Sequence, residues 1–299
     1  MAQIKLMTGT VLARRNVTPG MVRVTLGGDG LRGFVSTGVG DEYVRFFFPD
    51  PETGELVLPD IDEKGFWKWP EGRKPAHCEC YTIRAVRSQH AGVEIDVDFV
   101  IHDHGRASEW AQRAEPGQTI AMREPYGIYE APTNADWQLF VCDATGLPAL
   151  GRLLEGLPAG TEARAIVEIP DAGHEQCFET QAALKLVYLH RSGNGIAPSC
   201  LEAAVRGVAV PEGRTPYVWV AAETKAVRPI RKYLRHELGW PASSYSVTGY
   251  WTDKLSEWEQ RWEALDPVVK RQIDDLWRSE RDGEEIADEV EATMEKFGL

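Results

Sequence analysis

Apolar residues alternate with polar ones in several short stretches of the first 125 residues. Four stretches, 21–26, 42–48, 80–86 and 93–101, combine β-branched and aromatic residues and therefore predict strands. One short helix is expected at 107–114, before Pro116-Gly117, and residues 49–76 form a long loop rich in Pro, Gly and charge. Loops of this length inside a domain are often functional. Several strands with a single helix predict a closed or nearly closed, Greek-key-like β-barrel.

The pattern changes near residue 137, where short apolar runs begin to alternate with helical segments. Strands are expected at 137–143, 162–169, 184–190, 217–222 and 245–250, with helices at 148–154, 197–206 and 227–238. This alternation is typical of a mainly parallel, Rossmann-like α/β sheet, which binds ligands at the carboxyl ends of its strands. We expect a β + α/β chain with a barrel domain over 1–130 and an α/β domain over 131–252. That order of domains suggests a flavin-dependent reductase.

A third segment, 253–299, has a helical pattern of its own. Apolar residues recur at steps of three and four in two groups: Trp258, Trp262, Leu265, Val269, Ile273 and Leu276, then Ile286, Val290, Met294 and Phe297. Asp266-Pro267 divides the first group as an N-cap followed by a proline at the first helical position. The segment carries 15 acidic and 7 basic residues. We therefore expect an acidic helical extension that packs on the body or on a second copy, which leaves a weak homo-oligomer open.

Composition excludes several classes of function. The chain has 33 basic and 46 acidic residues, a net charge of −13, which argues against nucleic acid as a partner. It has no long apolar run and no apolar leader at its start, so we expect a soluble, cytoplasmic protein without integral membrane association. Its five cysteines fit neither a disulfide framework nor an iron–sulfur site, and Cys78-x-Cys80 is a weak metal signal. Redox chemistry would therefore need an organic cofactor.

Four segments carry candidate chemistry. In Tyr81-Thr82-Ile83-Arg84, strand alternation places Tyr81 and Ile83 on one face and Thr82 and Arg84 on the other. A flat aromatic cofactor could stack on Tyr81 while Thr82 and Arg84 donate hydrogen bonds to its oxygens. In the second, Asp98-Phe99-Val100-Ile101-His102 leads through a Gly loop to Arg106-Ala107-Ser108-Glu109-Trp110, a helix start that could hold a pyrophosphate. The others, Asp143-Ala144-Thr145-Gly146 and Gly193-Asn194-Gly195, follow α/β strands and could meet a nucleotide phosphate. Asp143 would repel an anion, so the first of these turns is not a simple phosphate cradle, and the second is equally compatible with an ordinary tight turn.

The order of these motifs resembles the siderophore-interacting protein family, flavin-dependent ferric-siderophore reductases related to the ferredoxin reductase superfamily. The resemblance rests on Tyr81-Thr82-x-Arg84, Asp98-Phe99-Val100-x-His102 and Ala107-Ser108-x-Trp110-Ala111. It continues through Leu147-Pro148-Ala149, Glu223, the helix at 227–239 and Gly249-Tyr250-Trp251, and so covers roughly residues 10–252.

The resemblance implies how the cofactors are held. Tyr81, Thr82 and Arg84 would contact the isoalloxazine, ribityl chain and phosphates of FAD. Asp98, Phe99, Val100 and His102 would line the flavin or its adenine, while Ala107, Ser108 and Trp110 would frame the pyrophosphate. The α/β domain would receive NADPH or NADH, with Asp143, Thr145 and Glu223 at the mouth of its site. Arg45, at a position usually occupied by Lys in the family, would form a basic substrate patch with Lys254, and Lys64, Lys68 and Arg73 are further candidates.

The chain departs from the family pattern at three positions. Glu79 occupies the first position of the R-x-Y-T motif, Arg106 stands where the family has Pro, and Thr252 replaces a common basic residue. Because Glu79 removes a phosphate-binding cation, we hypothesise that Arg106 supplies the missing charge.

These features predict a ferric-siderophore reductase that moves electrons from NAD(P)H through FAD to Fe(III), releasing Fe(II) during iron acquisition. Protein residues mainly position the partners, since the cofactor carries the electrons. A second possibility is an NAD(P)H-dependent reductase of free flavin, a quinone or a protein partner. A third is a non-catalytic siderophore-binding protein that has lost turnover through the change at Glu79.

Overall fold

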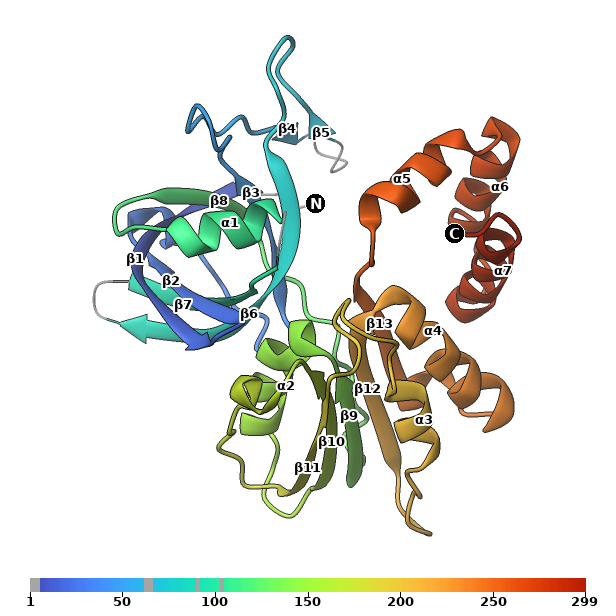
Figure 1. Ribbon diagram of the computed structural model, residues 1–299. Helices are drawn as coiled ribbons and strands as arrows, with labels where there is room; N and C mark the ends of the chain where they lie inside the picture. Colours follow the sequence, from blue (N-terminus) through green and yellow to red (C-terminus); the bar gives the residue numbers. More distant parts are fainter. Residues whose placement is uncertain (1–5, 62–66, 90–91, 103–104) are drawn as a thin grey trace. The chain divides into compact units, whose positions relative to one another are not determined.

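The computed structural model describes residues 6–61, 67–89, 92–102 and 105–299. Its N-terminal part is a closed antiparallel barrel with the strand order β1-β2-β7-β6-β3-β8 (Figure 1). The strands are β1 (Leu6–Thr18), β2 (Met21–Gly27), β3 (Tyr43–Phe48), β6 (His77–Gln89), β7 (Gly92–Val100) and β8 (Thr119–Arg123). The predicted barrel and its helix, α1 (Arg106–Arg113), are therefore confirmed. The long loop contains a small antiparallel pair, β4 (Asp60–Ile61) and β5 (Trp67–Lys68).

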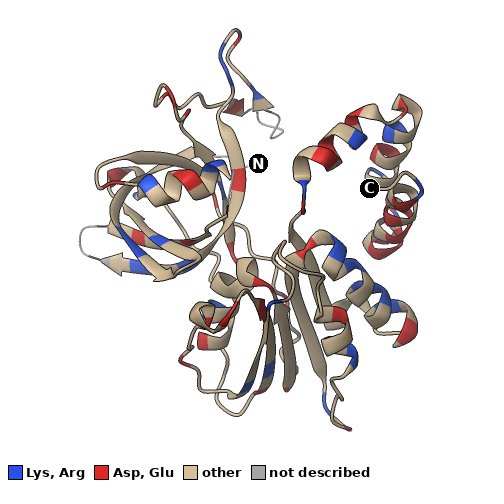
Figure 2. Ribbon diagram, in the orientation of Figure 1, with Lys and Arg blue, Asp and Glu red and all other residues tan. Residues whose placement is uncertain are grey.

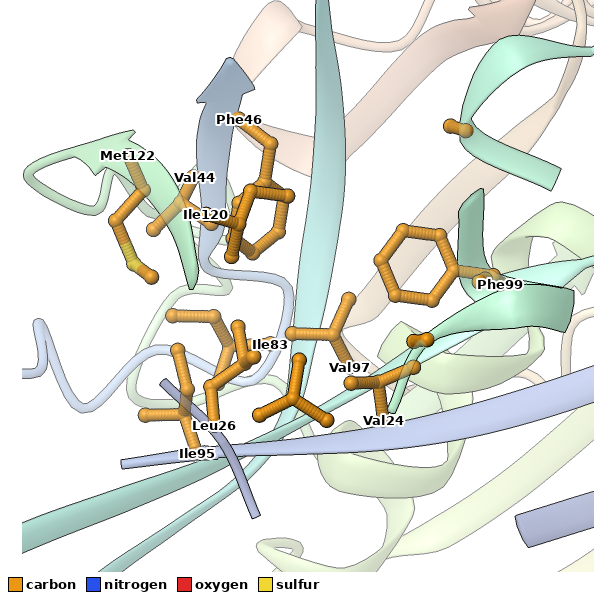
Figure 3. Packing of buried hydrophobic residues seen from close by; sticks show 14 of the residues in the cluster. Val24, Leu26, Val44, Phe46, Ile83, Ile95, Val97, Phe99, Ile120 and Met122 are labelled. Atoms are coloured by element: carbon orange, nitrogen blue, oxygen red, sulfur yellow. The ribbon is translucent and has the colours of Figure 1, made fainter. Parts of the chain in front are cut away.

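Alternating apolar positions of the strands fill the barrel. Val24, Leu26, Val44, Phe46 and Ile83 are all completely buried in one cluster (Figure 3). Ala107 and Ala111 of α1 join the same cluster, so the helix closes the barrel through small side chains that allow close approach. The helix position is thereby fixed relative to β6 and β7, the two strands that carry the candidate motifs.

The second part is a five-stranded sheet in the order β11-β10-β9-β12-β13. Its strands are β9 (Trp137–Cys142), β10 (Glu162–Ile169), β11 (Ala183–His190), β12 (Pro216–Glu223) and β13 (Tyr245–Trp251). The pairs β9–β10, β10–β11 and β9–β12 are parallel, as the alternation predicts.

Helices cover both faces of this sheet (Figure 1). Apolar residues of α2 (Leu147–Glu155) pack on one face, and those of α3 (Leu201–Arg206) and α4 (Thr224–Lys232) pack on the other. Beyond α4 the chain continues as a π-helical turn over Tyr233–Glu237, so the predicted single helix at 227–238 changes its hydrogen-bond pattern.

Residues Met1–Tyr250 form one compact unit and Trp251–Leu299 a second. The second unit contains α5 (Leu255–Ala264), α6 (Pro267–Trp277) and α7 (Gly283–Lys296), which bury Ile273, Ile286 and Val290 together. Asp266 caps α6 by accepting a hydrogen bond from the Val268 amide at 2.7 Å, as predicted. Acidic positions recur along all three helices (Figure 2). Within the described part of the chain, no helix is long and apolar enough to cross a bilayer.

Candidate active site

The two faces of β6 lead to different environments. Tyr81 and Ile83 pack in the barrel cluster, whereas Thr82 and Arg84 lie on the outer face. Burial raises the pKa of Tyr250, on β13, above its ordinary value, and the neighbouring Thr82 side chain acts in the opposite direction. Arg84 forms a two-pronged ion pair with Glu155 of α2, with Nη1 donating to Oε2 at 2.8 Å. The outer face of the motif is therefore joined to the α/β domain, and its alternation is as predicted.

Aromatic rings gather beneath Tyr81. Its ring centroid lies 4.5 Å from that of Phe99, and Phe99 lies 5.7 Å from Trp110 of α1. Phe99 is completely buried, which makes it a support for the rings of Tyr81 and Trp110. Val100, the next residue, packs instead against the α2 side of the α/β sheet. Direct contact of Phe99 and Val100 with a flavin stays a prediction.

Glu79 lies on the same face of β6 as His77 and Tyr81. Its carboxylate is paired with the His77 imidazole and accepts a hydrogen bond from the Tyr81 hydroxyl at 2.9 Å. Burial acts to raise the pKa of Glu79, but His77, Tyr81 and the nearby His102 outweigh it and hold the pKa below its ordinary value. An ionised acid thus occupies the position of the family arginine, beside the imidazoles of His77 and His102.

The N-terminus of α1 lies beside these groups and has no side-chain cap. Gly105 makes the approach tight, because a Cβ at this position would lie 2.2 Å from Cε1 of His102. Ser108 is buried and fixes the preceding loop: its hydroxyl accepts from the His102 amide at 3.1 Å and donates to the His102 carbonyl at 3.0 Å. Ala107 is buried, while Arg106 is exposed at the first helical position.

Asp98 has a partner within the barrel. Arg23 on β2 donates two hydrogen bonds to its carboxylate, at 2.6 and 2.7 Å, from the residue directly opposite in the strand register. The carboxylate is therefore neutralised, and its predicted contact with a cofactor would have to share these oxygens with Arg23.

At the carboxyl end of β9, Asp143 organises the first α/β turn. Its buried carboxylate accepts from the Thr145 amide at 2.8 Å, the Thr145 hydroxyl at 2.6 Å and the Glu223 amide at 3.0 Å. Glu223 in turn caps α4 by accepting from the Lys225 and Ala226 amides. The structure thus brings the three predicted residues together, with their oxygens engaged in shaping the turns.

The second predicted junction lies beside the first. Asn194 accepts a hydrogen bond from the Ala144 amide at 3.0 Å and donates to the Glu168 carbonyl at 3.1 Å. The two weak motifs therefore form one edge of the sheet at the ends of β9, β10 and β11.

A pocket of about 210 Å³ opens on the outer face of the barrel, lined by Tyr43, Arg45, Arg123, Glu124 and Tyr126. The guanidinium carbons of Arg45 and Arg123 lie 5.3 and 5.9 Å from the ring centre of Trp67. Strand register places Tyr43 opposite Thr82 and Arg45 opposite Cys80, so the pocket adjoins the motif strand. Burial acts to lower the pKa of Arg45, but the neighbouring Cys80 side chain outweighs it and raises the pKa above its ordinary value.

The other predicted basic residues are spread out. Lys68 lies on β5, beside the Trp67 that Arg45 contacts, whereas Arg73 pairs with Glu55 and Lys64 lies outside the described residues. Lys254, in the second unit, adopts a left-handed conformation before α5, with φ of 53°. Its place in a patch with Arg45 stays a prediction.

Comparison with known proteins identifies the family. A model described as "Siderophore-interacting FAD-binding domain" matches residues 10–129, and one described as "Siderophore-interacting protein" matches residues 135–254. The chain belongs to the siderophore-interacting protein family. The predicted family resemblance is thereby confirmed.

Three relatives of this family member illustrate the match. The NADPH-dependent ferric-chelate reductase of Escherichia coli is 30% identical over 248 residues, covering 82% of this chain and 92% of the relative. Ferric vibriobactin reductase ViuB of Vibrio cholerae is 30% identical over 240 residues, covering 80% and 86%. The crystal structure of a siderophore utilization protein from T. fusca superposes with a TM-score of 0.73 at 33% identity, covering 85% of this chain and 95% of that one.

The residues of this family member fit FAD. The uncapped first turn of α1, with Gly105 against His102, offers free backbone donors for a pyrophosphate, and Arg106 adds a cation. The buried Nε of Arg84 has no hydrogen-bond partner among the described residues. Tyr81 and Trp110 supply flat surfaces over a rigid aromatic core.

Several site residues are absent from the sequence-based prediction. Strand register brings His77 beside Glu79 and Arg123 into the arginine pocket. The long loop brings Trp67 against Arg45. His77 could have been found as the next residue on the face of Glu79 and Tyr81. Trp67 carries no comparable signal, because it lies in the long loop.

Proposed function

We propose that this chain is a ferric-siderophore reductase that passes electrons from NADPH or NADH through FAD to Fe(III) held by a siderophore, acting in the cytoplasm. In this proposal residues 1–130 hold FAD, 131–252 receive the nicotinamide donor and 253–299 are a helical extension. Family membership and about 30% identity to two named ferric-chelate reductases support it.

The arginine pocket beside Thr82 is the observation that carries the substrate assignment. Arg45 and Arg123 put two cations next to the motif strand of a protein whose net charge is −13. Many ferric siderophores are anionic, so a local basic site is needed to attract them against the overall charge. Trp67 holds both guanidinium groups by contact with its ring face.

When bound, FAD accepts a hydride from the donor and gives up single electrons. The chain's own residues bring the partners together. Thr82 of the motif strand lies beside Tyr250 on the last strand of the α/β sheet, and the Arg84–Glu155 ion pair joins the motif strand to α2. The arginine pocket lies on the same outer face, so donor and acceptor approach a common region of β6.

The test is an anaerobic visible spectrum of FAD-supplemented, desalted protein, to which NADPH and then a ferric siderophore are added. We expect bound flavin to bleach with NADPH and to recover with the chelate. Arg45→Gln and Arg123→Gln should raise the KM for the chelate without slowing bleaching. The matched control is Arg15→Gln, an equal charge change at an exposed position of β1.

Three outcomes would contradict the proposal in different ways. Faster reoxidation by free flavin or a quinone than by the ferric chelate would indicate a different reductase. Protein that retains no flavin would favour a siderophore-binding protein. Unchanged chelate KM in both arginine variants would leave the reductase activity but remove the pocket as its substrate site.

A further inference from the structure

Cys80 is an exposed thiol on the outer face of β6, the strand that carries the candidate FAD motif. Strand alternation places it on the same face as Thr82, two residues later. In the register with β3 it lies directly opposite Arg45, a residue of the arginine pocket. A nucleophilic side chain therefore lies beside the two cations proposed to receive the ferric chelate.

The neighbouring thiol on this face is less suited to reaction. Cys78 lies opposite Phe47 in the register and is half-buried. Burial raises the pKa of the Cys78 thiol, although Arg45 and Arg123 act in the opposite direction. Because the thiolate is the attacking form of cysteine, Cys78 is held in its unreactive form at neutral pH. Cys80 is therefore the thiol of this face that a dissolved molecule can attack or be attacked by.

The arginine pocket offers donors for an anion beside Cys80. Neither Arg45 nor Arg123 pairs with a carboxylate within the ranges that the structure describes. The Nε of Arg123 is buried and has no hydrogen-bond partner among those residues. Glu124 is the only acid among the described residues that line the pocket, so its lining carries two cations and one anion. Arginine binds carboxylates through paired N–H donors, so a ligand that carries carboxylates fits these groups.

The juxtaposition of a thiol and an anion site points to a particular class of reagent. We propose that Cys80 is a site of reversible thiolation by the disulfide of a small thiol that carries carboxylates, of which oxidised glutathione is an example. Its carboxylates bind Arg45 and Arg123, and one of its sulfurs then meets the Cys80 side chain. The attached group fills the arginine pocket and blocks the ferric chelate. This last consequence rests on the proposed function, whereas the modification itself does not.

The reaction is a thiol–disulfide exchange. The Cys80 thiolate attacks one sulfur of the disulfide, a new sulfur–sulfur bond forms and the original one breaks. The departing half leaves as a thiolate and takes up a proton, so Cys80 is oxidised and the departing half is reduced. The disulfide is thus the oxidant, and an excess of the free thiol reverses the step.

Peptide mass spectrometry measures the modification without turnover. FAD-loaded protein is incubated with oxidised glutathione, and we expect Cys80 to be modified faster than Cys177 and Cys200, two other exposed thiols. Cystamine, a disulfide that carries ammonium groups instead of carboxylates, should show no such preference. Arg45→Gln combined with Arg123→Gln should slow the reaction of Cys80 with oxidised glutathione about tenfold and leave its reaction with neutral iodoacetamide unchanged.

Reduction of a ferric siderophore gives the second measurement, with each variant compared with its own untreated sample. Oxidised glutathione should slow this step in the wild type and not in Cys80→Ser, and dithiothreitol should restore it. Cys78→Ser should still form the adduct. Flavin bleaching by NADPH should not change on modification, because the arginine pocket serves the chelate.

Several results would overturn the inference. Equal rates at Cys80, Cys177 and Cys200, or equal rates of Cys80 with glutathione disulfide and cystamine, would show that the pocket does not recruit the reagent. A disulfide between Cys78 and Cys80 with no attached group would replace thiolation by a different reaction. An adduct that leaves chelate reduction unchanged would remove the block. If untreated protein reduces no ferric siderophore but Cys80 is modified with the expected charge preference, the proposed function fails and the modification site stands.

Discussion

The indole Nε1 of Trp219 donates a hydrogen bond of 3.0 Å to Oδ2 of Asp41, and both residues are buried. Trp219 lies on β12 of the α/β sheet, and Asp41 lies just before β3 of the barrel. The other Asp41 oxygen accepts from the amides of Ile128 and Tyr129, in the segment that connects the two domains. One carboxylate therefore joins the barrel, the connection and the sheet.

Trp219→Phe should destabilise the protein by about 1–3 kcal/mol, because it removes one donor from a buried carboxylate while keeping an aromatic ring. The matched control is Trp137→Phe, since Trp137 is equally buried but its Nε1 has no hydrogen-bond partner among the described residues. Both variants lose the same indole volume, so Trp137→Phe should be destabilising as well, but by less than Trp219→Phe because no hydrogen bond is lost. Urea denaturation followed by circular dichroism measures both, and equal losses in the two variants would show that the Asp41 hydrogen bond contributes nothing specific.

Glu42 forms a second link next to the first. Its buried carboxylate accepts from Arg152 of α2 at 2.7 Å and from the Ser36 hydroxyl at 2.7 Å. Arg152 also donates to the carbonyl of Ile83, between Thr82 and Arg84, at 3.1 Å. The ion pair thus holds α2 against the motif strand, and neutralising Glu42 leaves a partly buried arginine without its partner.

Stability should consequently depend on pH through Glu42. Burial acts to raise its pKa, but hydrogen bonds from Ser36, Thr37 and Arg152 outweigh burial and hold the pKa below the ordinary 4.5. The contribution is complete above pH 4.5 and is lost as the pH falls through the folded-state pKa. Glu42→Gln should cost about 3–5 kcal/mol at neutral pH and flatten the decline in acid. Glu237→Gln is the control, because Glu237 lies in an exposed ion pair with Arg206. If the free energy of unfolding of Glu42→Gln falls with decreasing pH as steeply as that of the wild type, Glu42 is not the group responsible.

Local patterns were sufficient to predict the strands and helices that carry the site. The alternation through Tyr81-Thr82-Ile83-Arg84 correctly separated a core face from an outer face, and Asp266-Pro267 correctly placed the start of α6. Both depend on residues adjacent in sequence, where strand and helix periodicity act directly. The barrel itself follows from the number of strands and the single helix.

Contacts between distant segments were beyond the same patterns. Nothing near Arg84 marks Glu155 as its partner, and nothing near Asp98 marks Arg23. The predicted cofactor residues therefore carry structural bonds that sequence alone did not assign. The pairing of Asn194 with Ala144 likewise needs the spatial order of β9, β10 and β11, which brings two separate turns to one edge.

Arg106→Ala should weaken FAD binding to flavin-stripped protein by about tenfold, because it removes a cation from the uncapped start of α1. Quenching of FAD fluorescence during titration gives the affinity. Arg113→Ala removes the same charge from the last turn of the same helix and should have little effect. Equal affinities in the two variants would show that Arg106 does not compensate for Glu79.

His77 and Glu79 should have opposite effects on the same affinity. Glu79→Gln removes an ionised acid from the position of the family's phosphate-binding arginine, so FAD should bind more tightly. His77→Ala leaves that acid without its paired imidazole, so FAD should bind more weakly, and the loss should disappear in the double variant with Glu79→Gln. Fluorescence titration of the three variants closes this double-mutant cycle. If His77→Ala weakens FAD binding as much in the Glu79→Gln background as in the wild type, His77 acts on the flavin site independently of Glu79. The His77–Glu79 pair would then not explain how this chain tolerates an acid at position 79.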